Sequence, residues 1–236
     1  MRVYGKNTCL EVLRNKKGIK KIYLQKSVDE KFKNEVEKLN NNVYYVDKDF
    51  LNKITNFKNH QGIVIEIDDF KYSSLDEILQ VHKDKHTKAF VLVLDGIEDP
   101  QNLGGLIRTA VCAGVDGIVI PKNRSASINE TVFKVSVGAI NYVKICEVTN
   151  INEAIKTIKK ENIFVYGLEA GEKVIYDCDF TYHCCLVVGS EGKGISKLTK
   201  KLCDEIISLP MFSKINSLNA SVAGAIGIYE IVRQRT

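Results

Sequence analysis

The sequence has no apolar stretch of the length that a membrane-spanning helix needs, about 20 consecutive residues. Its first residues, Met-Arg-Val-Tyr-Gly-Lys-Asn, also lack the apolar core of a secretory signal. No internal repeat and no low-complexity tract is present. These absences exclude a membrane-spanning chain and predict a protein that is not secreted.

Metal-binding and redox motifs are missing as well. The seven cysteines are scattered and none forms a CxxC pair, while the four histidines form no HExxH pattern. An odd number of cysteines without a framework is typical of reduced thiols in the cytosol. The sequence therefore predicts a cytoplasmic protein with no metal site.

The 236 residues are enough for one large or two small domains, and an apolar fraction of 44% supports a substantial core. Positive charge is concentrated in the first third. Residues 1–67 carry 14 Lys and Arg against 8 Asp and Glu, a net of +6, whereas residues 68–236 carry a net of −1. A basic module suits a polyanion such as RNA. The alternative is a lysine-rich composition that gives solubility and nothing more.

Apolar periodicity predicts an α/β chain in two parts. Residues 1–67 alternate short helices with strands at 19–24, 43–46 and 62–67, and residues 68–87 form a polar linker with one weak helix. Residues 88–236 open on Ala-Phe-Val-Leu-Val-Leu, a run typical of a strand buried on both faces of a parallel sheet. Strands and helices then alternate, which predicts a mainly parallel sheet.

Three polar, glycine-rich stretches each follow a predicted buried strand. They are residues 95–109, ahead of a helix predicted at 106–113, residues 189–194, and residues 208–229, whose polar loop spans 213–219. In open parallel sheets, ligands bind beyond the carboxyl ends of the strands. Three such loops in one domain predict a site there, although residues 189–194 match neither GxGxxG nor a Walker loop.

The last helix, from residue 220, is unusual because small residues fill its first half, including Gly224 and Gly227. Glycine lowers helix stability by about 1 kcal/mol relative to alanine. Such a helix predicts either tight packing or close approach by a ligand or partner chain. Ser217 and Asn219 are alternative caps for its first turn.

Read together, the motifs are more specific than each alone. Residues 99–109 (Asp-Pro-Gln-Asn-Leu-Gly-Gly-Leu-Ile-Arg-Thr), residues 189–196 (Gly-Ser-Glu-Gly-Lys-Gly-Ile-Ser) and residues 209–223 resemble, in this order, the three motifs of the SpoU (TrmH-like) RNA ribose methyltransferases of the SPOUT superfamily. The resemblance covers the whole chain. Tyr4-Gly5 and His60-Gln61-Gly62 resemble the family's N-terminal substrate-binding domain, with His60 a candidate RNA contact.

The resemblance implies several properties. The domains would be an RNA-binding domain at 1–67, a linker at 68–87 and a methyltransferase domain at 88–236 with a deep trefoil knot. The cofactor would be S-adenosyl-L-methionine, and the knot region would join two copies in a homodimer through the small face of the last helix. Residues 121–126 and 136–139 resemble the branch that methylates a guanosine ribose of 23S rRNA. A tRNA target and a non-catalytic ribosome-assembly factor are the alternatives.

The resemblance also implies roles for individual residues. Cofactor contacts fall on Gly189, Leu209 and Leu218, with Gly167 and Met211 beside them. Catalytic positions fall on Arg108, Asn102, Glu191, Asn219 and Ser217. Since a hydroxyl is a weak nucleophile and an arginine stays protonated, we expect Arg108 to stabilise a forming alkoxide. The proton acceptor would be an RNA phosphate or Glu191, with the two asparagines orienting the hydroxyl and Ser217 positioning substrate.

Overall fold

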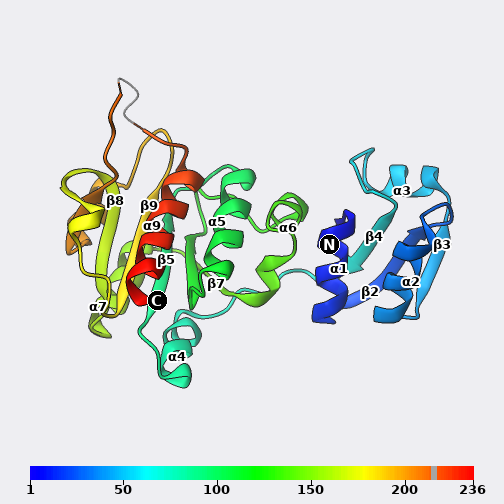
Figure 1. The fold of residues 1–236 in the computed structure, drawn as a ribbon, viewed down its shortest axis with the longest axis horizontal. Helices are drawn as coiled ribbons and strands as arrows, with labels where there is room; N and C mark the ends of the chain where they lie inside the picture. Colours follow the sequence, from blue (N-terminus) through cyan, green and yellow to red (C-terminus); the bar gives the residue numbers. More distant parts are fainter. Residues whose placement is uncertain (214–216) are drawn as a thin grey trace. The chain divides into compact units, whose positions relative to one another are not determined.

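The computed structural model describes residues 1–213 and 217–236, so part of the polar loop predicted at 213–219 lies outside it. The chain divides into two compact units. The first holds Met1–Lys71 and Ile128–Asn141, and the second holds Tyr72–Ser127 and Tyr142–Thr236. The α/β class expected from the sequence is confirmed (Figure 1).

The first unit is a four-stranded mixed sheet with helices. The sheet order is β1-β4-β2-β3, in which β2 pairs with β3 in parallel and β4 is antiparallel to both β1 and β2. Its elements are β1 (Arg2–Tyr4), α1 (Lys6–Asn15), β2 (Ile19–Gln25), α2 (Glu30–Leu39), β3 (Val43–Val46), α3 (Lys48–Ile54), β4 (Ile63–Ile67) and α6 (Glu130–Val135).

Two features of this unit differ from the sequence expectation. The strand β1 spans only three residues, too few for alternation to reveal it. The segment Ile128–Asn141, which we expected in the second domain, belongs to the first unit, where α6 packs on β1. There Lys134 places its Nζ 4.8 Å from the centre of the Tyr4 ring, and Lys58 pairs with Glu130.

His60 has a structural position rather than the expected surface one. Its side chain is buried, its Nδ1 accepts the Gly62 N–H at 3.0 Å, and its Nε2 lies 3.1 Å from Asn52 Oδ1. Burial lowers the pKa of His60, which favours the neutral ring that this arrangement needs. With both ring nitrogens engaged, His60 braces the turn before β4.

The second unit is built on six parallel strands in the order β10-β8-β9-β5-β6-β7. The strands are β5 (Phe90–Asp95), β6 (Gly117–Pro121), β7 (Lys144–Val148), β8 (Phe164–Val174), β9 (Cys184–Gly189) and β10 (Glu205–Ser208). The helices are α4 (Leu75–Lys85), α5 (Pro100–Cys112), α7 (Ile151–Lys160), α8 (Lys197–Leu202) and α9 (Ala220–Arg235), with a short 3-10 turn at Ile175–Asp177. Another 3-10 turn, Ala139–Tyr142, lies where the chain passes from the first unit back to the second.

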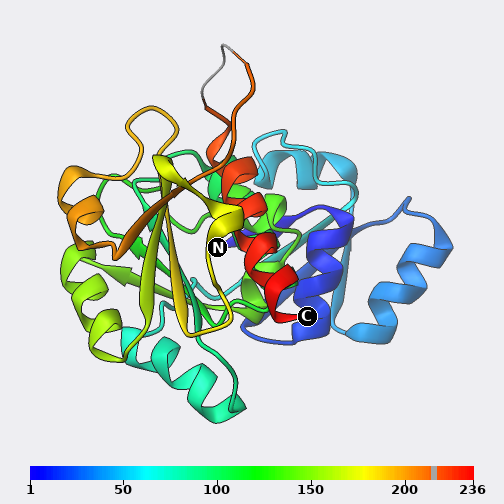
Figure 2. The same ribbon diagram turned by 60° about the vertical axis from the view of Figure 1, so that its left-hand side comes forward.

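Helices cover both faces of this sheet, which explains why its central strands are apolar on both sides (Figures 1 and 2). On one face α4 and α7 pack against Val91, Val93 and Val187. On the other, α9 packs on β8, β9 and α5. The residues we expected as a linker are therefore divided, because Ser74 caps α4 and Ile78 of α4 is fully buried in the core of the second unit.

The small residues of α9 serve close packing inside the chain. A Cβ built on Gly224 would lie 2.4 Å from Leu106 Cδ2, and one on Gly227 would lie 3.0 Å from Leu168 Cδ2. Both glycines are buried, whereas Val222 and Tyr229 of the same helix are exposed. The expectation that the small face meets a partner chain is therefore wrong for these two glycines, since their face is filled by the chain's own core.

We expect Gly224→Val to destabilise the second unit by about 1–3 kcal/mol, because the added side chain would overlap Leu106. Melting followed by circular dichroism should show this as a loss of about 2–4 °C for each kcal/mol. Ala225→Val is the matched control, since Ala225 is the next residue and is only partly buried. Equal melting temperatures for the two variants would contradict the packing role.

Within the described residues, no helix is both long and apolar enough to cross a bilayer.

Candidate active site

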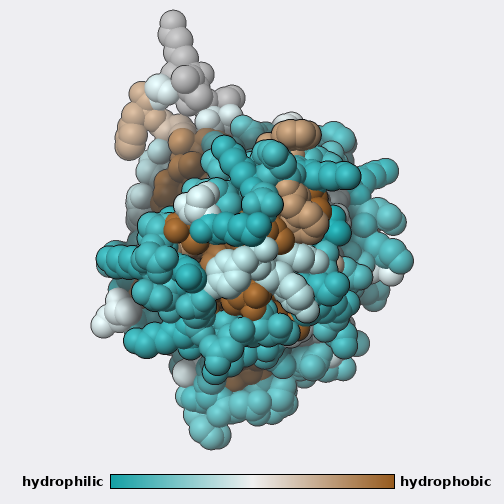
Figure 3. All heavy atoms as spheres, turned by 90° about the vertical axis from the view of Figure 1, so that its right-hand side faces the viewer, coloured by the Kyte–Doolittle hydropathy of each residue, from teal (hydrophilic) through white to brown (hydrophobic). Residues whose placement is uncertain are grey.

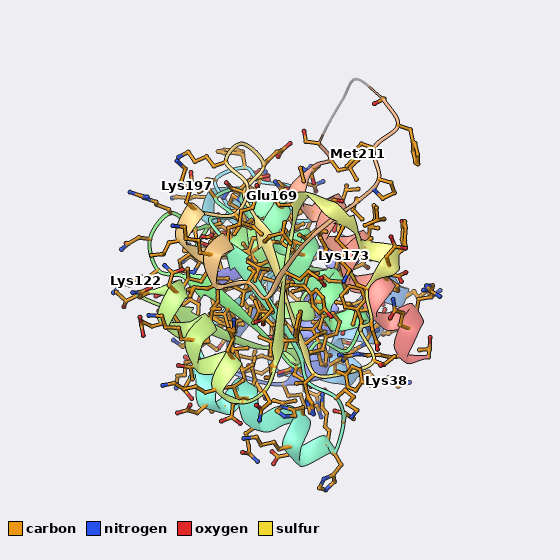
Figure 4. All side chains as sticks on the ribbon, turned by 90° about the vertical axis from the view of Figure 1, so that its left-hand side faces the viewer. Lys38, Lys122, Glu169, Lys173, Lys197 and Met211 are labelled. Atoms are coloured by element: carbon orange, nitrogen blue, oxygen red, sulfur yellow. The ribbon has the colours of Figure 1, made fainter. Side chains whose placement is uncertain are left out.

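The ends of β5 and β9 lie side by side at one edge of the sheet, next to the middle of β8. The register pairs Asp95 of β5 with Gly189 of β9, and Leu168 of β8 with Val188 of β9. A cavity of about 420 Å³ lies at this edge. It is lined by Leu168–Ala170, Val188–Gly194, Leu209, Met211, Ser217, Leu218, Ala220 and Ala223. Figure 4 shows Glu169 and Met211 at this same end of the unit.

The cavity contains most of the residues that the sequence assigned to cofactor contact. Gly189, Leu209, Met211 and Leu218 line it, and so does Ser217. Gly167 does not. A Cβ on Gly167 would lie 2.7 Å from Ile206 Cδ1, so this glycine gives room to β10, and the residues just after it reach the cavity instead.

Residues 189–194 form a tight loop beside the cavity. Ser190 N–H donates to the Gly194 carbonyl at 3.1 Å, and Gly194 N–H donates to the Ser190 carbonyl at 2.9 Å. A Cβ on Gly189 would lie only 2.2 Å from the Gly194 carbonyl carbon, and Gly194 has a positive φ of 63°. Glycine is required at 189, because backbone occupies the place of a side chain, and it is favoured at 194, where the backbone is left-handed.

Glu169 holds this loop from the neighbouring strand. Its carboxylate accepts the Ile195 N–H at 3.0 Å and pairs with Lys200 Nζ at 3.0 Å. Nothing in the sequence marks Glu169, because its partners are distant along the chain and it lies in no motif. The loop is thus fixed to β8, and the carboxylates of Glu169 and Glu191 both border the cavity.

A second cavity of about 300 Å³ shares the loop Ser190–Lys193 with the first. Its other side is formed by Gly96–Asp99 and Asn102. Two ligands bound in the two cavities would therefore meet across one loop. This arrangement suits a reaction in which a group passes from one bound molecule to another.

Three polar side chains from the three motifs converge at this loop. Asn219 Nδ2 donates to Asn102 Oδ1 at 2.9 Å and to Glu191 Oε2 at 3.3 Å. Asn102 Nδ2 lies 3.5 Å from the same Glu191 oxygen, a longer and weaker contact. One carboxylate held between two amides can orient a hydroxyl and accept its proton. The described residues contain no cluster of His, Cys, Asp and Glu that could hold a metal ion.

Asn219 also caps α9, which decides between the two capping candidates. Its Oδ1 accepts the N–H groups of Ser221 at 3.0 Å and Val222 at 3.4 Å. Ser217 lines the first cavity instead. The same Asn219 side chain therefore fixes the helix with its oxygen and the polar cluster with its nitrogen.

We expect Asn219→Ala to lower the free energy of unfolding by about 0.5–2 kcal/mol, the usual cost of losing such a cap. Asn219→Ser should recover most of this loss, since a serine hydroxyl is a comparable cap acceptor. Denaturant titration of both variants measures the difference. Equal destabilisation would mean that capping is not the main structural role of Asn219.

Asn102 lies in the first turn of α5, which begins at Pro100, six residues before the helix start that we expected at Leu106. Asp99 caps the helix by accepting the Gln101 N–H at 3.0 Å, and Pro100 occupies the first helical position. Aspartate followed by proline is a known start signal, and it could have placed this boundary. The two glycines that follow obscured it.

Arg108 is not part of this convergence. It is exposed on α5, lines neither cavity, and makes no hydrogen bond or ion pair within residues 1–213 and 217–236. It lies three residues after Gly105, on a similar side of the helix. A Cβ on Gly105 would lie 3.5 Å from Ser221 Cβ at the start of α9. Its guanidinium is therefore available to a ligand that reaches this part of α5.

Comparison with known protein families matches the two halves of the chain separately. The model of the SpoU rRNA methylase family matches residues 89–229. A model described as RNA 2'-O ribose methyltransferase substrate binding matches residues 2–73. Together they cover nearly the whole sequence.

Similar proteins are found among both sequences and structures. The chain is 38% identical to a Staphylococcus haemolyticus protein assigned to the TrmH family of tRNA/rRNA methyltransferases, across 99% of this chain and 95% of that protein. It is 37% identical to an uncharacterised tRNA/rRNA methyltransferase of Synechocystis, across 99% of this chain but only 62% of that protein's length. The fold matches the SpoU methyltransferase AviRb of Streptomyces viridochromogenes, solved with AdoMet, at a TM-score of 0.84 and 21% identity, covering 100% of this chain and 90% of AviRb.

Proposed function

From the premise that this chain belongs to the SpoU rRNA methylase family, we propose that it methylates a ribose 2'-hydroxyl of RNA, with a guanosine of 23S rRNA as its target. At the coarser level it is an RNA methyltransferase that uses S-adenosyl-L-methionine. What we propose beyond this is the atom that is methylated, the ribose 2'-oxygen, and the RNA that is the substrate, 23S rRNA.

The residues around the larger cavity fit this cofactor. Leu168, Val188, Leu209 and Leu218 offer apolar contact for a flat ring. The backbone of the loop after Gly189 offers N–H and C=O groups at close range, since glycines carry no side chain in the way. When bound, the cofactor supplies an electrophilic methyl group on a positively charged sulfur.

The observation that carries the 2'-hydroxyl proposal is the convergence of Asn102, Glu191 and Asn219 at the loop shared by the two cavities. A sugar hydroxyl is a weak nucleophile, so its proton must be accepted as the new bond forms. We assign Glu191 or an RNA phosphate to that step, and the two asparagine amides to orienting the hydroxyl. Ser217, at the edge of the larger cavity, helps to position the substrate.

Arg108 stabilises the negative charge that develops on the ribose oxygen in this proposal. Its exposure and its lack of a partner within the described chain support a role toward bound RNA. A guanidinium stays protonated and offers five N–H donors in a planar fork, which suits a phosphate or an alkoxide. It acts as a charge stabiliser rather than as a base.

RNA binding is assigned to residues 1–67, with 68–87 as the connection and 88–236 as the methyltransferase domain. The match of residues 2–73 to a substrate-binding family and the excess positive charge of residues 1–67 support this division. Ribosomal RNA is preferred over tRNA because a whole domain precedes the catalytic one, and we place the reaction in the cytoplasm.

Two further expectations from the family remain proposals: the trefoil knot at the cofactor cavity and a homodimer through this region. Since Gly224 and Gly227 face the chain's own core, the exposed side of α9 with Val222 and Tyr229 is the surface we assign to the partner subunit. Both side chains are about half exposed, at 47% and 49%.

The test is transfer of a labelled methyl group from S-adenosyl-L-methionine to total rRNA and, separately, to tRNA from a strain that lacks the gene. We expect label in 23S rRNA. Alkaline hydrolysis should release it as a dinucleotide, since a methylated 2'-oxygen cannot attack the neighbouring phosphate. Label in tRNA alone would favour the alternative target, and label in mononucleotides would place the methyl on a base. No transfer to either RNA, with cofactor bound normally, would leave a non-catalytic RNA-binding protein.

A further inference from the structure

One face of the sheet in the first unit carries a group of aromatic rings. Tyr23 of β2 pairs with Val64 of β4 and with Tyr44 of β3, so these side chains share a face. The Tyr23 ring lies 6.0 Å from that of Tyr44 and 5.3 Å from that of Phe50 on α3, between ring centres. We call Tyr23, Tyr44 and Phe50 the aromatic platform.

The platform is open to solvent, although it adjoins a buried cluster. Tyr44 is 48% exposed and Phe50 41% exposed, while Tyr4, Leu51 and Val64 next to them are buried. Figure 3 looks onto the β3 side of this unit and shows apolar and weakly polar atoms gathered within a hydrophilic surface. Large exposed rings grouped in this way mark a binding surface more often than chance exposure does.

Positive charge borders the platform. Lys21 lies two residues before Tyr23 on the same face of β2, and Lys53 lies three residues after Phe50 on α3. Both lysines are exposed, and neither forms an ion pair within the part of the chain that the structure describes. Of the nearby acids, Glu66 pairs with Arg2 at 2.9 Å and Asp47 pairs with Lys26 at 3.1 Å, which leaves Asp49 on α3 as the opposing charge.

We propose that the aromatic platform is a stacking site for unpaired bases of the RNA substrate, with Lys21 and Lys53 neutralising the adjacent phosphates. The inference rests on the proposed function for its ligand, but it does not depend on the methylation chemistry. Exposed aromatic side chains stack unpaired bases in other RNA-binding domains, and every base offers a face for such stacking.

The chemistry of the surface favours single-stranded RNA over other partners. A duplex hides the faces of its bases, so rings such as Tyr44 and Phe50 gain contact only with unstacked nucleotides. Protein interfaces are depleted of lysine at their centres, whereas rings interleaved with lysines suit a chain of phosphates and bases. A loop or an unpaired junction of the RNA is therefore the ligand we assign.

The experiment measures binding of a single-stranded RNA that contains 2-aminopurine, using the full-length protein. We expect the wild type to quench the fluorescence on binding. Tyr44→Ala and Phe50→Ala should each remove part of the quenching and weaken affinity about tenfold, a typical loss for one stacked base. Tyr44→Phe should keep both signals. Lys53→Ala should lower the salt dependence of binding by about 0.7 in slope, the value for one phosphate contact on a single strand.

Tyr45→Ala is the matched control, because Tyr45 is the next residue on β3. Its side chain lies on the opposite face of the sheet, where its hydroxyl contacts Glu37 and it is 40% exposed. We expect this variant to bind RNA like the wild type. Circular dichroism of every variant confirms that the domain is folded.

Affinity and quenching unchanged in both Tyr44→Ala and Phe50→Ala would overturn the inference, as would an equal loss in Tyr45→Ala. A change of oligomeric state in these variants, with RNA affinity intact, would overturn it too and assign the face to a contact between copies.

Methyl transfer measured in parallel separates the two proposals. Platform-dependent binding without transfer to any RNA contradicts the proposed function alone, and transfer that is indifferent to the platform contradicts this inference alone.

Discussion

Arg108→Ala should leave cofactor affinity unchanged and lower the rate of methyl transfer at least a hundredfold. Removing one donor that stabilises a developing oxyanion typically costs a factor of 10²–10³ in turnover. The cofactor should bind normally, because Arg108 lines neither cavity and α5 holds its position through buried residues such as Leu106. Single-turnover transfer and calorimetric titration of the cofactor measure the two quantities.

Arg108→Lys is the control for this prediction. Lysine keeps the charge but loses the planar fork of donors, so we expect an intermediate rate. A lysine variant as slow as the alanine variant would point to geometry rather than charge. Wild-type turnover in Arg108→Ala would show that Arg108 has no role in the mechanism. The asparagine amides would then be the groups that stabilise the developing charge.

Gly189→Val should abolish measurable cofactor binding. A Cβ at this position would lie 2.2 Å from the carbonyl carbon of Gly194 and 2.3 Å from the Ile195 nitrogen. These are backbone atoms of the loop that borders both cavities, so they cannot swing aside as a flexible side chain could. The loop must move, and the contacts it offers to a ligand move with it. We expect the dissociation constant for the cofactor to rise more than a hundredfold.

Ala225→Val is the control, because Ala225 is only partly buried and lines neither cavity. It should bind the cofactor like the wild type. Since Gly189→Val can also lower stability by about 1–3 kcal/mol, cofactor titration is run well below its melting temperature. Unchanged cofactor affinity in a folded Gly189→Val protein would show that this loop does not shape the binding site.

Much of the fold follows from local pattern. The run at 89–94 is apolar at every position, and the structure confirms β5 as a central strand with both faces covered by helices. The start of α5 was missed because two glycines and a polar run outweighed the Asp99-Pro100 signal. The sequence pattern did not predict β1, because its pairing with β4 joins residues 60 or more positions apart and three residues show no period.

The residues of the candidate site also fall into two groups, those whose position the sequence predicted and those whose position it did not. The sequence predicted that Gly189, Leu209, Met211 and Leu218 share a cofactor site, and all four line one cavity. It could not predict that Gly167 would instead make room for Ile206, or that Glu169 would hold the loop through Ile195. Both outcomes depend on neighbours supplied by other strands.

By itself, the sequence determined the family, the class of fold and the identity of the polar residues that end the strands. These are properties of short segments, written in residue type and spacing. Only the tertiary structure decided which of those residues meet. Asn219 touches Asn102 and Glu191 across 117 and 28 positions of sequence, while Arg108, in the same motif as Asn102, stands apart. The physical reason is that contacts between strand ends are set by the order of strands in the sheet and by the side of each helix that faces it, and neither is a local property of the chain.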